Sequence, residues 1–225
     1  MNSWFVTGTD TGVGKTLVSV ALLQALARRH RRVVGMKPVA AGVVRVGTLW
    51  ANDDALALRA ASTVSVPPEL DNPVLLPDPL SPHIAAQRAG VQIDIDHIVR
   101  CYQQLAGLAD AVVVEGAGGF HVPLSDHTTG ADLAQALALP DVLVVGLRLG
   151  CLNHALLTLE AIRARGLTLA GWVANRIDPE MLAPQENIAF LQHRLGAPLL
   201  ADIGHQVAVP PDPRAVAITL PTAYP

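Results

Sequence analysis

The sequence predicts an α/β protein in which a mostly parallel sheet is flanked by helices on both faces. Short β-rich runs alternate with stretches whose apolar residues recur at helical spacing. The run Ala111–Glu115 is almost wholly apolar, as expected when helices bury both faces of a strand. A glycine-rich turn separates the first strand from the first long helix, which is typical of folds that bind an anionic ligand at this point.

The first half of the chain supplies two strands and three helices. We expect strands over Trp4–Thr7 and Val33–Pro38 and a helix over Leu17–Arg29, with amphipathic helices over Asp53–Ala61 and Ile93–Leu108. Between them, Ser62–Gly90 holds many of the 17 prolines of the chain. We expect this segment to be irregular, a surface excursion that helps to form a substrate pocket.

The second half repeats the alternation. The expected elements are strands over Ala111–Glu115, Asp141–Leu147, Leu167–Ala174 and Leu199–Ile203, with helices over Asn153–Arg165 and Pro184–Leu195. The tail after Val209 is proline-rich and is expected to be extended. Because no boundary demands a second domain, we expect residues 1–225 to form one domain.

Composition excludes several classes of function. The net charge is −3, with 16 basic and 19 acidic residues, which indicates no affinity for nucleic acid or anionic lipid. Cys101 and Cys151 have no zinc-site spacing, and two cysteines do not make a disulfide scaffold. The start of the chain lacks the features of a signal peptide, and no apolar run is long enough to span a membrane. We therefore expect a soluble cytoplasmic protein.

The strongest motif is the run from Gly8 to Thr16, which reads Gly-Thr-Asp-Thr-Gly-Val-Gly-Lys-Thr between the first strand and the first helix. In a phosphate-binding loop, glycines let backbone N–H groups turn toward phosphate oxygens at a helix N-terminus. Lys15 would reach the β and γ phosphates, and the Thr16 hydroxyl would lie on Mg²⁺. The motif predicts nucleotide binding and a fold of the P-loop NTPase type.

The spacing of this loop is unusual, because five residues separate Gly8 from Gly14 where four are normal. Partitioning and septum-positioning ATPases carry a second lysine early in the loop. Asp10 and Thr11 stand at the corresponding positions here, so that lysine is missing.

Four charged residues lie at the ends of predicted elements, where functional side chains are common. Glu115 ends a buried strand and is followed by a Gly/Ala-rich turn, the place where α/β sheets put functional groups. Lys37 ends the second strand and would neighbour the phosphate loop. Asp53 and Asp54 begin a helix; Asp53 fits an N-cap, and Asp54 is either a second cap residue or a metal ligand.

Together these residues resemble the dethiobiotin synthetase family, the ATP-dependent carboxylases of biotin synthesis. The resemblance runs along nearly the whole chain and is most specific in Val6–Thr11 and Leu149–His154. The five-residue loop spacing is also a feature of that family. The resemblance implies an enzyme that converts 7,8-diaminononanoate, CO₂ and ATP into dethiobiotin, ADP and phosphate.

The resemblance also implies roles for individual residues. Lys37, Lys15 and Thr11 would be catalytic, and Thr16, Asp54 and Glu115 would hold Mg²⁺. ATP would be bound by Gly12, Val13, Gly14, Lys15, Thr16, Leu17, Asp54, Glu115, Gly116, Ala117, Gly118, Asn175, Arg176, Gly204, His205 and Gln206. Substrate would meet Thr11, Lys37 and Ala41, and its carboxylate would meet Gly150, Cys151, Leu152 and Asn153 across the interface of a homodimer.

The sequence departs from the family pattern at four places. Ala41 stands where a serine commonly touches substrate, so one hydroxyl contact is absent. Arg176 replaces a small acidic residue, Pro211 replaces an acidic one, and Gly204-His205-Gln206 lacks the usual proline. The changes at Arg176, Pro211 and Gly204-His205-Gln206 concern the base of the nucleotide, and all four leave the phosphate and metal positions intact.

Three other functions are compatible with a phosphate loop. A partitioning-type ATPase switch would carry the early lysine that is missing here. Relatives of cobyrinate diamide synthase carry a glutaminase domain, for which this chain has no room. A nucleotide-binding protein without chemistry would not need Lys15, Lys37, Asp54 and Glu115 together.

Overall fold

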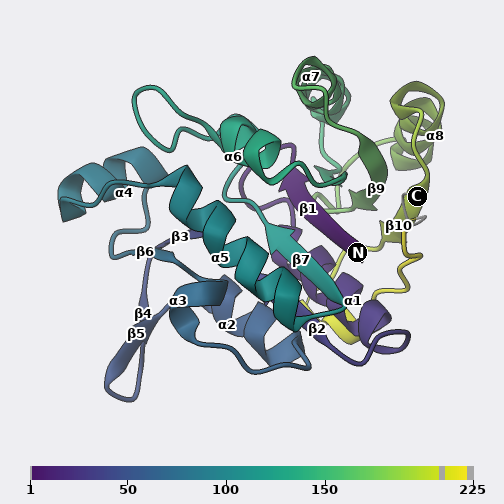
Figure 1. Ribbon diagram of the computed structural model, residues 1–225. Helices are drawn as coiled ribbons and strands as arrows, with labels where there is room; N and C mark the ends of the chain where they lie inside the picture. The colour runs from purple at the N-terminus through teal and green to yellow at the C-terminus, as the bar shows by residue number, and fades with distance from the viewer. Residues whose placement is uncertain (1, 208–210, 222–225) are drawn as a thin grey trace.

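The computed structural model describes residues 2–207 and 211–221 and confirms the expected α/β architecture (Figure 1). Six strands form one sheet in the order β10-β9-β8-β1-β7-β2, and every neighbouring pair is parallel. The strands are β1 (Asn2–Gly8), β2 (Val33–Met36), β7 (Ala111–Glu115), β8 (Asp141–Gly146), β9 (Leu169–Asn175) and β10 (Leu199–Ile203). Because all six run the same way, their carboxyl ends share one edge of the sheet.

Helices cover both faces of this sheet. On one face, α1 (Lys15–Ala27) and α2 (Asp53–Ala61) pack on apolar residues such as Val6, Val113 and Val144. The other face is covered by α5 (Ile95–Leu108), α6 (Gly130–Leu137), α7 (Cys151–Ala164) and α8 (Pro184–Leu195). The residues of β7 and β8 are buried along their whole length, which explains why these runs are nearly all apolar.

The segment 62–90 is not irregular, and this expectation was wrong. It contains α3 (Pro68–Asp71), β6 (Val74–Leu76) and α4 (Pro82–Ala89), and β6 pairs in parallel with β3 (Val39–Ala41). Val74 and Leu76 are buried in the main core. The high proline content suggested irregular structure, but Pro68 and Pro82 occupy the first positions of helices, where proline is favoured.

A helix and a two-stranded hairpin were also missed in the sequence. Helix α6 is short, and its signal is a capping pair in which the Thr129 backbone N–H donates to the Asp132 carboxylate at 2.7 Å. Strands β4 (Val44–Val46) and β5 (Leu49–Ala51) form an antiparallel hairpin on the side of α2 (Figure 1). The hairpin carries the exposed side chains of Val46, Leu49 and Trp50.

The C-terminal segment was expected to be extended, and the part at residues 211–221 runs without regular structure except for a short 3₁₀ turn at Pro213–Ala215. Val216, Ile218 and Leu220 pack on the α1 side of the core. Residues 209–210 and 222–225 of the expected tail lie outside the described residues. Across residues 2–207 and 211–221, no helix combines the length and apolarity needed to cross a membrane.

One buried carboxyl lies far from the carboxyl edge. Asp141 begins β8, is 0% exposed, and neither of its carboxyl oxygens has a hydrogen-bond partner within the described residues. Burial raises the pKa of Asp141 to about 8. The folded protein therefore holds the neutral acid at pH values where the unfolded chain is ionised.

We expect Asp141→Asn to remove a pH dependence of stability. Between about pH 4 and pH 8 only the folded state keeps the proton of Asp141, so rising pH favours unfolding. Relative to the variant, the wild-type free energy of unfolding should fall by up to about 1.4 kcal/mol per pH unit in this window. Urea unfolding at a series of pH values measures it, and parallel profiles for the two proteins would contradict the assignment.

Candidate active site

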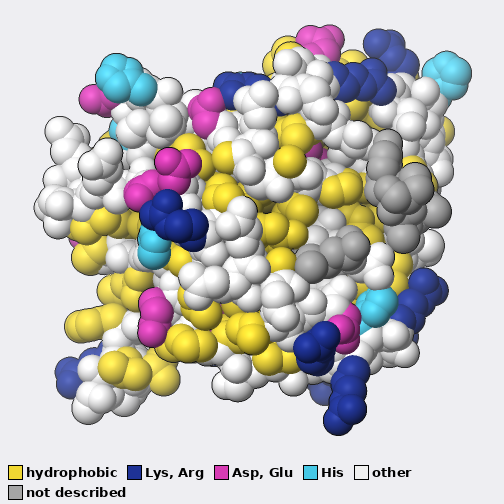
Figure 2. Space-filling view, viewed as in Figure 1, with side chains coloured by type: hydrophobic (Ala, Val, Ile, Leu, Met, Phe, Trp, Pro, Cys, Tyr) yellow, Lys and Arg dark blue, Asp and Glu magenta, His cyan; other side chains and the backbone are white. Residues whose placement is uncertain are grey.

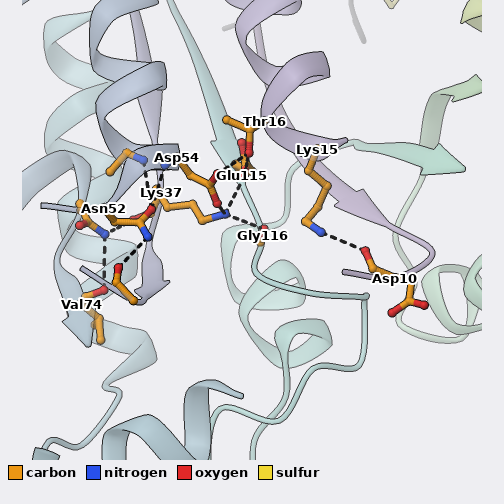
Figure 3. Close-up of polar contacts among 12 residues, drawn as sticks. Asp10, Lys15, Thr16, Lys37, Asn52, Asp54, Val74, Glu115 and Gly116 are labelled. Carbon is orange, nitrogen blue, oxygen red and sulfur yellow. Dashed lines mark hydrogen bonds and ion pairs between the residues drawn. The ribbon is translucent and has the colours of Figure 1, made fainter. Parts of the chain in front are cut away.

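The carboxyl edge of the sheet brings together the polar residues that the sequence singled out. The loop after β1 holds Lys15, Lys37 follows β2, and Glu115 is the last residue of β7. Asp54 comes from the first turn of α2, which lies against α1 and β2. Figure 3 shows the side chains of Thr16, Lys37, Asp54 and Glu115 converging on one point.

The phosphate loop is braced by a residue from β9. The Asn175 side-chain amide donates to the Val13 carbonyl at 2.8 Å, and Asn175 is buried. Gly14 has φ 94, a left-handed conformation that favours glycine. A Cβ atom on Gly14 would overlap the Asn175 amide nitrogen. Asn175 therefore fixes the backbone of the phosphate loop through its hydrogen bond to Val13. The sequence did not predict this role for Asn175.

Lys15 begins α1 and turns back over the loop. Its ammonium donates to the Asp10 carbonyl at 3.1 Å, and the side chain is buried (Figure 3). Burial, and after it the nearby Lys37 ammonium, lower the pKa of Lys15 to about 8. An anion bound at this place would favour the charged form.

Lys37 lies between the two carboxylates. Its Nζ atom is 2.6 Å from Glu115 Oε1 and 2.8 Å from Asp54 Oδ2. Burial by itself would lower the pKa of Lys37, but the charges of Glu115 and Asp54 outweigh it, so the pKa is raised. For Asp54, burial would raise the pKa, but the Lys37 ammonium and the Thr16 hydroxyl hold it below its usual value. Lys37 and Asp54 are therefore both charged at neutral pH.

The same carboxylates and Thr16 form a set of oxygen donors. Thr16 Oγ1 is 2.8 Å from Asp54 Oδ1 and 2.9 Å from Glu115 Oε1, and its one hydrogen serves one acceptor at a time. Glu115 Oε2 is buried and has no partner among the described residues. No group of three or more His, Cys, Asp or Glu converges within residues 2–207 and 211–221. Oxygen donors of this kind, among them the unpartnered Glu115 Oε2, suit a hard cation that also keeps water or phosphate ligands.

Lys15 and Lys37 are the only lysines among the 225 residues, whereas 14 arginines make up the remaining basic side chains. Both are buried, at 7% and 4% exposure, while the arginines of the surface are largely exposed. Placing both ammonium groups at one buried site is costly unless they neutralise anions. Their concentration at the carboxyl edge therefore indicates binding of an anionic ligand.

The glycine-rich turn after β7 packs on the phosphate loop. A Cβ atom on Gly119 would lie 3.6 Å from the Gly8 and Thr9 carbonyl oxygens, and one on Gly118 would lie 3.5 Å from Thr11 Oγ1. The Gly116 carbonyl is 3.4 Å from Lys37 Nζ. The predicted residues Gly116, Ala117 and Gly118 thus lie beside the loop, and Thr11 is exposed next to them.

The predicted base-binding residues gather at the ends of β9 and β10. The Arg176 guanidinium pairs with Asp202 at 2.9 and 2.8 Å, and His205 Nδ1 is 3.2 Å from the Arg176 carbonyl. Arg176, Gly204 and His205 line a hollow of about 350 Å³. Gln206 is not among the lining residues of this hollow, and its side-chain oxygen accepts from the Asp212 N–H at 2.8 Å. Pro211 lines a separate hollow of about 830 Å³ with Thr16 and Leu17.

The predicted substrate residues are divided between two places. Ala41 ends β3 and is half-buried. Gly150 caps α7, and Cys151, Leu152 and Asn153 form its first turn, with Cys151 buried and Asn153 exposed. A third hollow, of about 390 Å³, lies between the phosphate loop and α7. It is lined by Thr9, Asp10, Gly119, Phe120, His121, His154, Leu157 and Thr158. The structure does not bring Ala41 to α7.

Several residues of the site were not predicted from the sequence. Asn52, not Asp53, is the N-cap of α2: it accepts from the Asp54 N–H at 3.0 Å and donates to the Gly42 carbonyl at 2.9 Å. Arg148 pairs with Asp10 at 2.5 Å and ties the loop after β8 to the phosphate loop. The signal for Asn52 was its place before two acidic residues at a helix start. Arg148 had no local signal.

Comparison with known proteins decides the family. A family model described as an AAA domain matches residues 2–211. The chain is 53% identical over 221 residues to the ATP-dependent dethiobiotin synthetase BioD of Aromatoleum aromaticum, covering 97% of each protein. It is 54% identical to the protein of the same name from Janthinobacterium sp. (strain Marseille), covering 96% of this chain and 92% of the other.

The chain belongs to the dethiobiotin synthetase family. The family resemblance stated from the motifs is thereby confirmed, as are the assignment as an ATP-dependent ligase of biotin biosynthesis and the P-loop type of fold.

Solved structures with the same fold are more distant. The MinD cell division protein of Aquifex aeolicus superposes with a TM-score of 0.56 at 16% identity, covering 92% of this chain and 84% of that one. A ParA family ATPase of Chlorobium tepidum gives a TM-score of 0.57 at 17% identity, covering 91% and 85%. At this identity the likeness concerns the fold alone.

We expect Gly14→Ala to weaken ATP binding by at least about tenfold, because left-handed strain of about 1–3 kcal/mol adds to the overlap with Asn175. Calorimetric titration with ATP measures this. Gly150→Ala is the matched control, since Gly150 also has φ 94 and caps a helix but meets no atom within 4 Å. Equal affinities for the two variants would contradict the bracing role of Asn175.

Proposed function

We propose that this enzyme joins CO₂ to 7,8-diaminononanoate in an ATP-driven ring closure that yields dethiobiotin, ADP and phosphate. The observation that carries the proposal is the convergence of Lys15, Lys37, Thr16, Asp54 and Glu115 at the carboxyl edge beside the phosphate loop. The relatives at 53% and 54% identity support the substrate class through their names.

The proposed reaction has three steps, and each step accounts for the bonds formed and broken. One amine of the substrate adds to CO₂ and loses a proton, which gives a carbamate. A carbamate oxygen attacks the γ phosphorus of ATP, ADP leaves, and a carbamic–phosphoric anhydride forms. The second amine attacks the carbonyl carbon, loses a proton and expels phosphate, which closes the cyclic urea.

The second step sets the electrostatic demand, because a carbamate anion must approach an anionic γ phosphate. Catalysis of phosphoryl transfer is mainly positioning and charge stabilisation. Lys15 lies on the loop and would meet the β and γ phosphates. Lys37, between Asp54 and Glu115, would stabilise the carbamate and the transferring phosphoryl. Thr11, exposed beside the loop, would contact the amine end of the substrate.

Thr16, Asp54 and Glu115 would hold Mg²⁺, for which their oxygen donors and the unpartnered Glu115 Oε2 are suited. When bound, Mg²⁺ supplies positive charge to the phosphate oxygens. Gly12 to Leu17 and Gly116 to Gly118 would line the phosphates. The base would lie near Asn175, Arg176 and Gly204 to Gln206, in or beside the 350 Å³ hollow.

The substrate carboxylate would meet the N-terminus of α7 from a second copy of the chain. The segment Gly150 to Asn153 forms this helix N-terminus, where an anion is favoured, although the Cys151 N–H already donates to the Arg148 carbonyl at 3.0 Å. Leu149, just before α7, is 95% exposed, and Leu157, on α7, is 55% exposed. These exposed apolar side chains support a homodimer that uses this surface.

A partitioning-type ATPase switch is the other function considered. It shares the fold, as the likeness to MinD and ParA proteins indicates. The signature lysine of that group is missing at Asp10 and Thr11. A switch would hydrolyse ATP without diaminononanoate, which the following experiment would detect.

Incubation of the purified protein with diaminononanoate, bicarbonate, Mg²⁺ and ATP should give dethiobiotin, measured by mass. Lys37→Gln should lower turnover by about 10²–10³-fold, by analogy with the loss of one oxyanion-stabilising donor. Its affinity for ATP should stay close to that of the wild type. Arg45→Gln, on the exposed hairpin, is the control for a lost positive charge.

Two outcomes would count against this proposal. Absence of product from the wild-type enzyme would refute the reaction. Equal losses of ATP affinity and turnover in Lys37→Gln would assign Lys37 to phosphate binding instead.

Leu157→Glu should convert the dimer to monomers and abolish dethiobiotin formation while ATP still binds, because charge on an apolar interface is costly to bury. Sedimentation velocity measures the mass. Leu182→Glu, at an 87% exposed position before α8, is the control and should leave the dimer intact. A dimeric, active Leu157→Glu protein would rule out this surface.

A further inference from the structure

The backbone of Lys37 is held by residues outside the main sheet. β2 is an edge strand, and its pairing with β7 ends at Met36. Beyond that point the Lys37 N–H donates to the Asp71 carbonyl at 2.7 Å. The Lys37 carbonyl accepts from the Asn72 side-chain amide, also at 2.7 Å. Both peptide groups of the lysine are thus bound by two successive residues at the end of α3.

An ion pair fixes this end of α3. The Asp71 carboxylate receives Arg59 Nε at 2.8 Å and an Arg59 terminal nitrogen at 2.5 Å, and Asp71 is 3% exposed. Burial raises the pKa of Asp71, and Arg59 opposes that rise. Asn72 is also buried, and its amide is 3.4 Å from the Val74 carbonyl as well. A bidentate guanidinium–carboxylate pair has a defined geometry.

Arg59 and Asp54 belong to the same helix. Asp54 lies in the first turn of α2 and pairs with the Lys37 ammonium, while Arg59 lies in its last turn. Helix α2 therefore contacts Lys37 in two ways. Asp54 binds its ammonium group directly, and Arg59 fixes the end of α3, where Asp71 and Asn72 bind the Lys37 backbone. No signal in the sequence joined these residues to Lys37.

We propose that Arg59, Asp71 and Asn72 are positioning residues that clamp the backbone of Lys37 and thereby aim its ammonium group. The proposal rests on the proposed function for the catalytic role of Lys37. The carboxylates at the head of Lys37 are also the expected cation ligands, so their hold on the ammonium weakens when ligands enter. The clamp then remains as the anchor, and displacements near 1 Å cost about 10²-fold in rate.

The test compares Asp71→Asn and Asn72→Leu with Asp110→Asn. Arg32 Nε and an Arg32 terminal nitrogen both donate to Asp110 Oδ1, at 3.1 and 2.7 Å. This ion pair lies at the opposite end of β2 and β7 from the site. It is the control for a lost arginine–aspartate pair. Asn72→Leu leaves the Arg59 pair intact, so it repeats the test if Asp71→Asn does not fold.

We expect both clamp variants to lower kcat for dethiobiotin formation by about 10²-fold while KM for ATP changes less than about threefold. Asp110→Asn should leave kcat unchanged. Equal kcat losses in all three variants, or a KM increase that matches the loss in the clamp variants, would overturn the proposal.

A spectroscopic measurement separates this proposal from the reaction itself. Because the chain has two lysines, lysine-selective ¹⁵N labelling gives two side-chain ammonium signals, and Lys37→Gln identifies one of them. The Lys37 signal should shift or broaden in Asp71→Asn and Asn72→Leu and stay in place in Asp110→Asn. If the wild type makes no dethiobiotin, the proposed reaction is refuted, but the ¹⁵N measurement still tests the positioning role. A Lys37 signal that is unchanged in Asp71→Asn and Asn72→Leu would overturn the proposal that these residues clamp the Lys37 backbone.

Discussion

The structure depends on one constellation of charge, in which the buried Lys37 ammonium lies between the buried Glu115 carboxylate and the partly exposed Asp54 carboxylate. Removing an ammonium and a carboxylate from water costs several kcal/mol per ion, and close pairing offsets that cost only when the geometry is good. Distances of 2.6 and 2.8 Å from Nζ meet the condition. Removal of one partner would leave an uncompensated buried charge, so the cluster ties the end of β7 and the start of α2 to the residue after β2.

The parallel sheet makes this constellation possible. Lys37, Glu115 and Asn175 are far apart in the chain, yet each lies at the carboxyl end of a strand and therefore at the same edge. The order of the strands places β1 between β7 and β8, so the phosphate loop lies next to Glu115 on one side and next to the loop that holds Arg148 on the other. Figure 2 shows one face of the molecule, where basic, acidic and apolar side chains are interspersed without a large field of one sign.

Fold and function separate clearly in the comparisons. The MinD and ParA proteins share the architecture at 16–17% identity, whereas the chain is 53–54% identical to the two dethiobiotin synthetases. A fold of this type supports both switches and synthetases, so the chemistry must be argued from side chains. Here the decisive side chains are the two lysines and the absence of a third at the start of the loop.

The sequence by itself determined the fold class, the phosphate loop, the presence of the buried strands and the family, because each depends on local periodicity or on a contiguous motif. It did not fix every strand end: the second strand ends at Met36, not at Pro38. It indicated Lys37 and Glu115 because strand ends are local signals. Only the tertiary structure decided that Asp54 contacts Lys37, that Asn175 holds the phosphate loop, and that Asp71 and Asn72 bind the Lys37 backbone. These contacts join segments distant in the chain, and their side chains carry no periodic pattern. Likewise, prolines marked 62–90 as irregular, but burial of Val74 and Leu76 against the core organised it into helices and a strand.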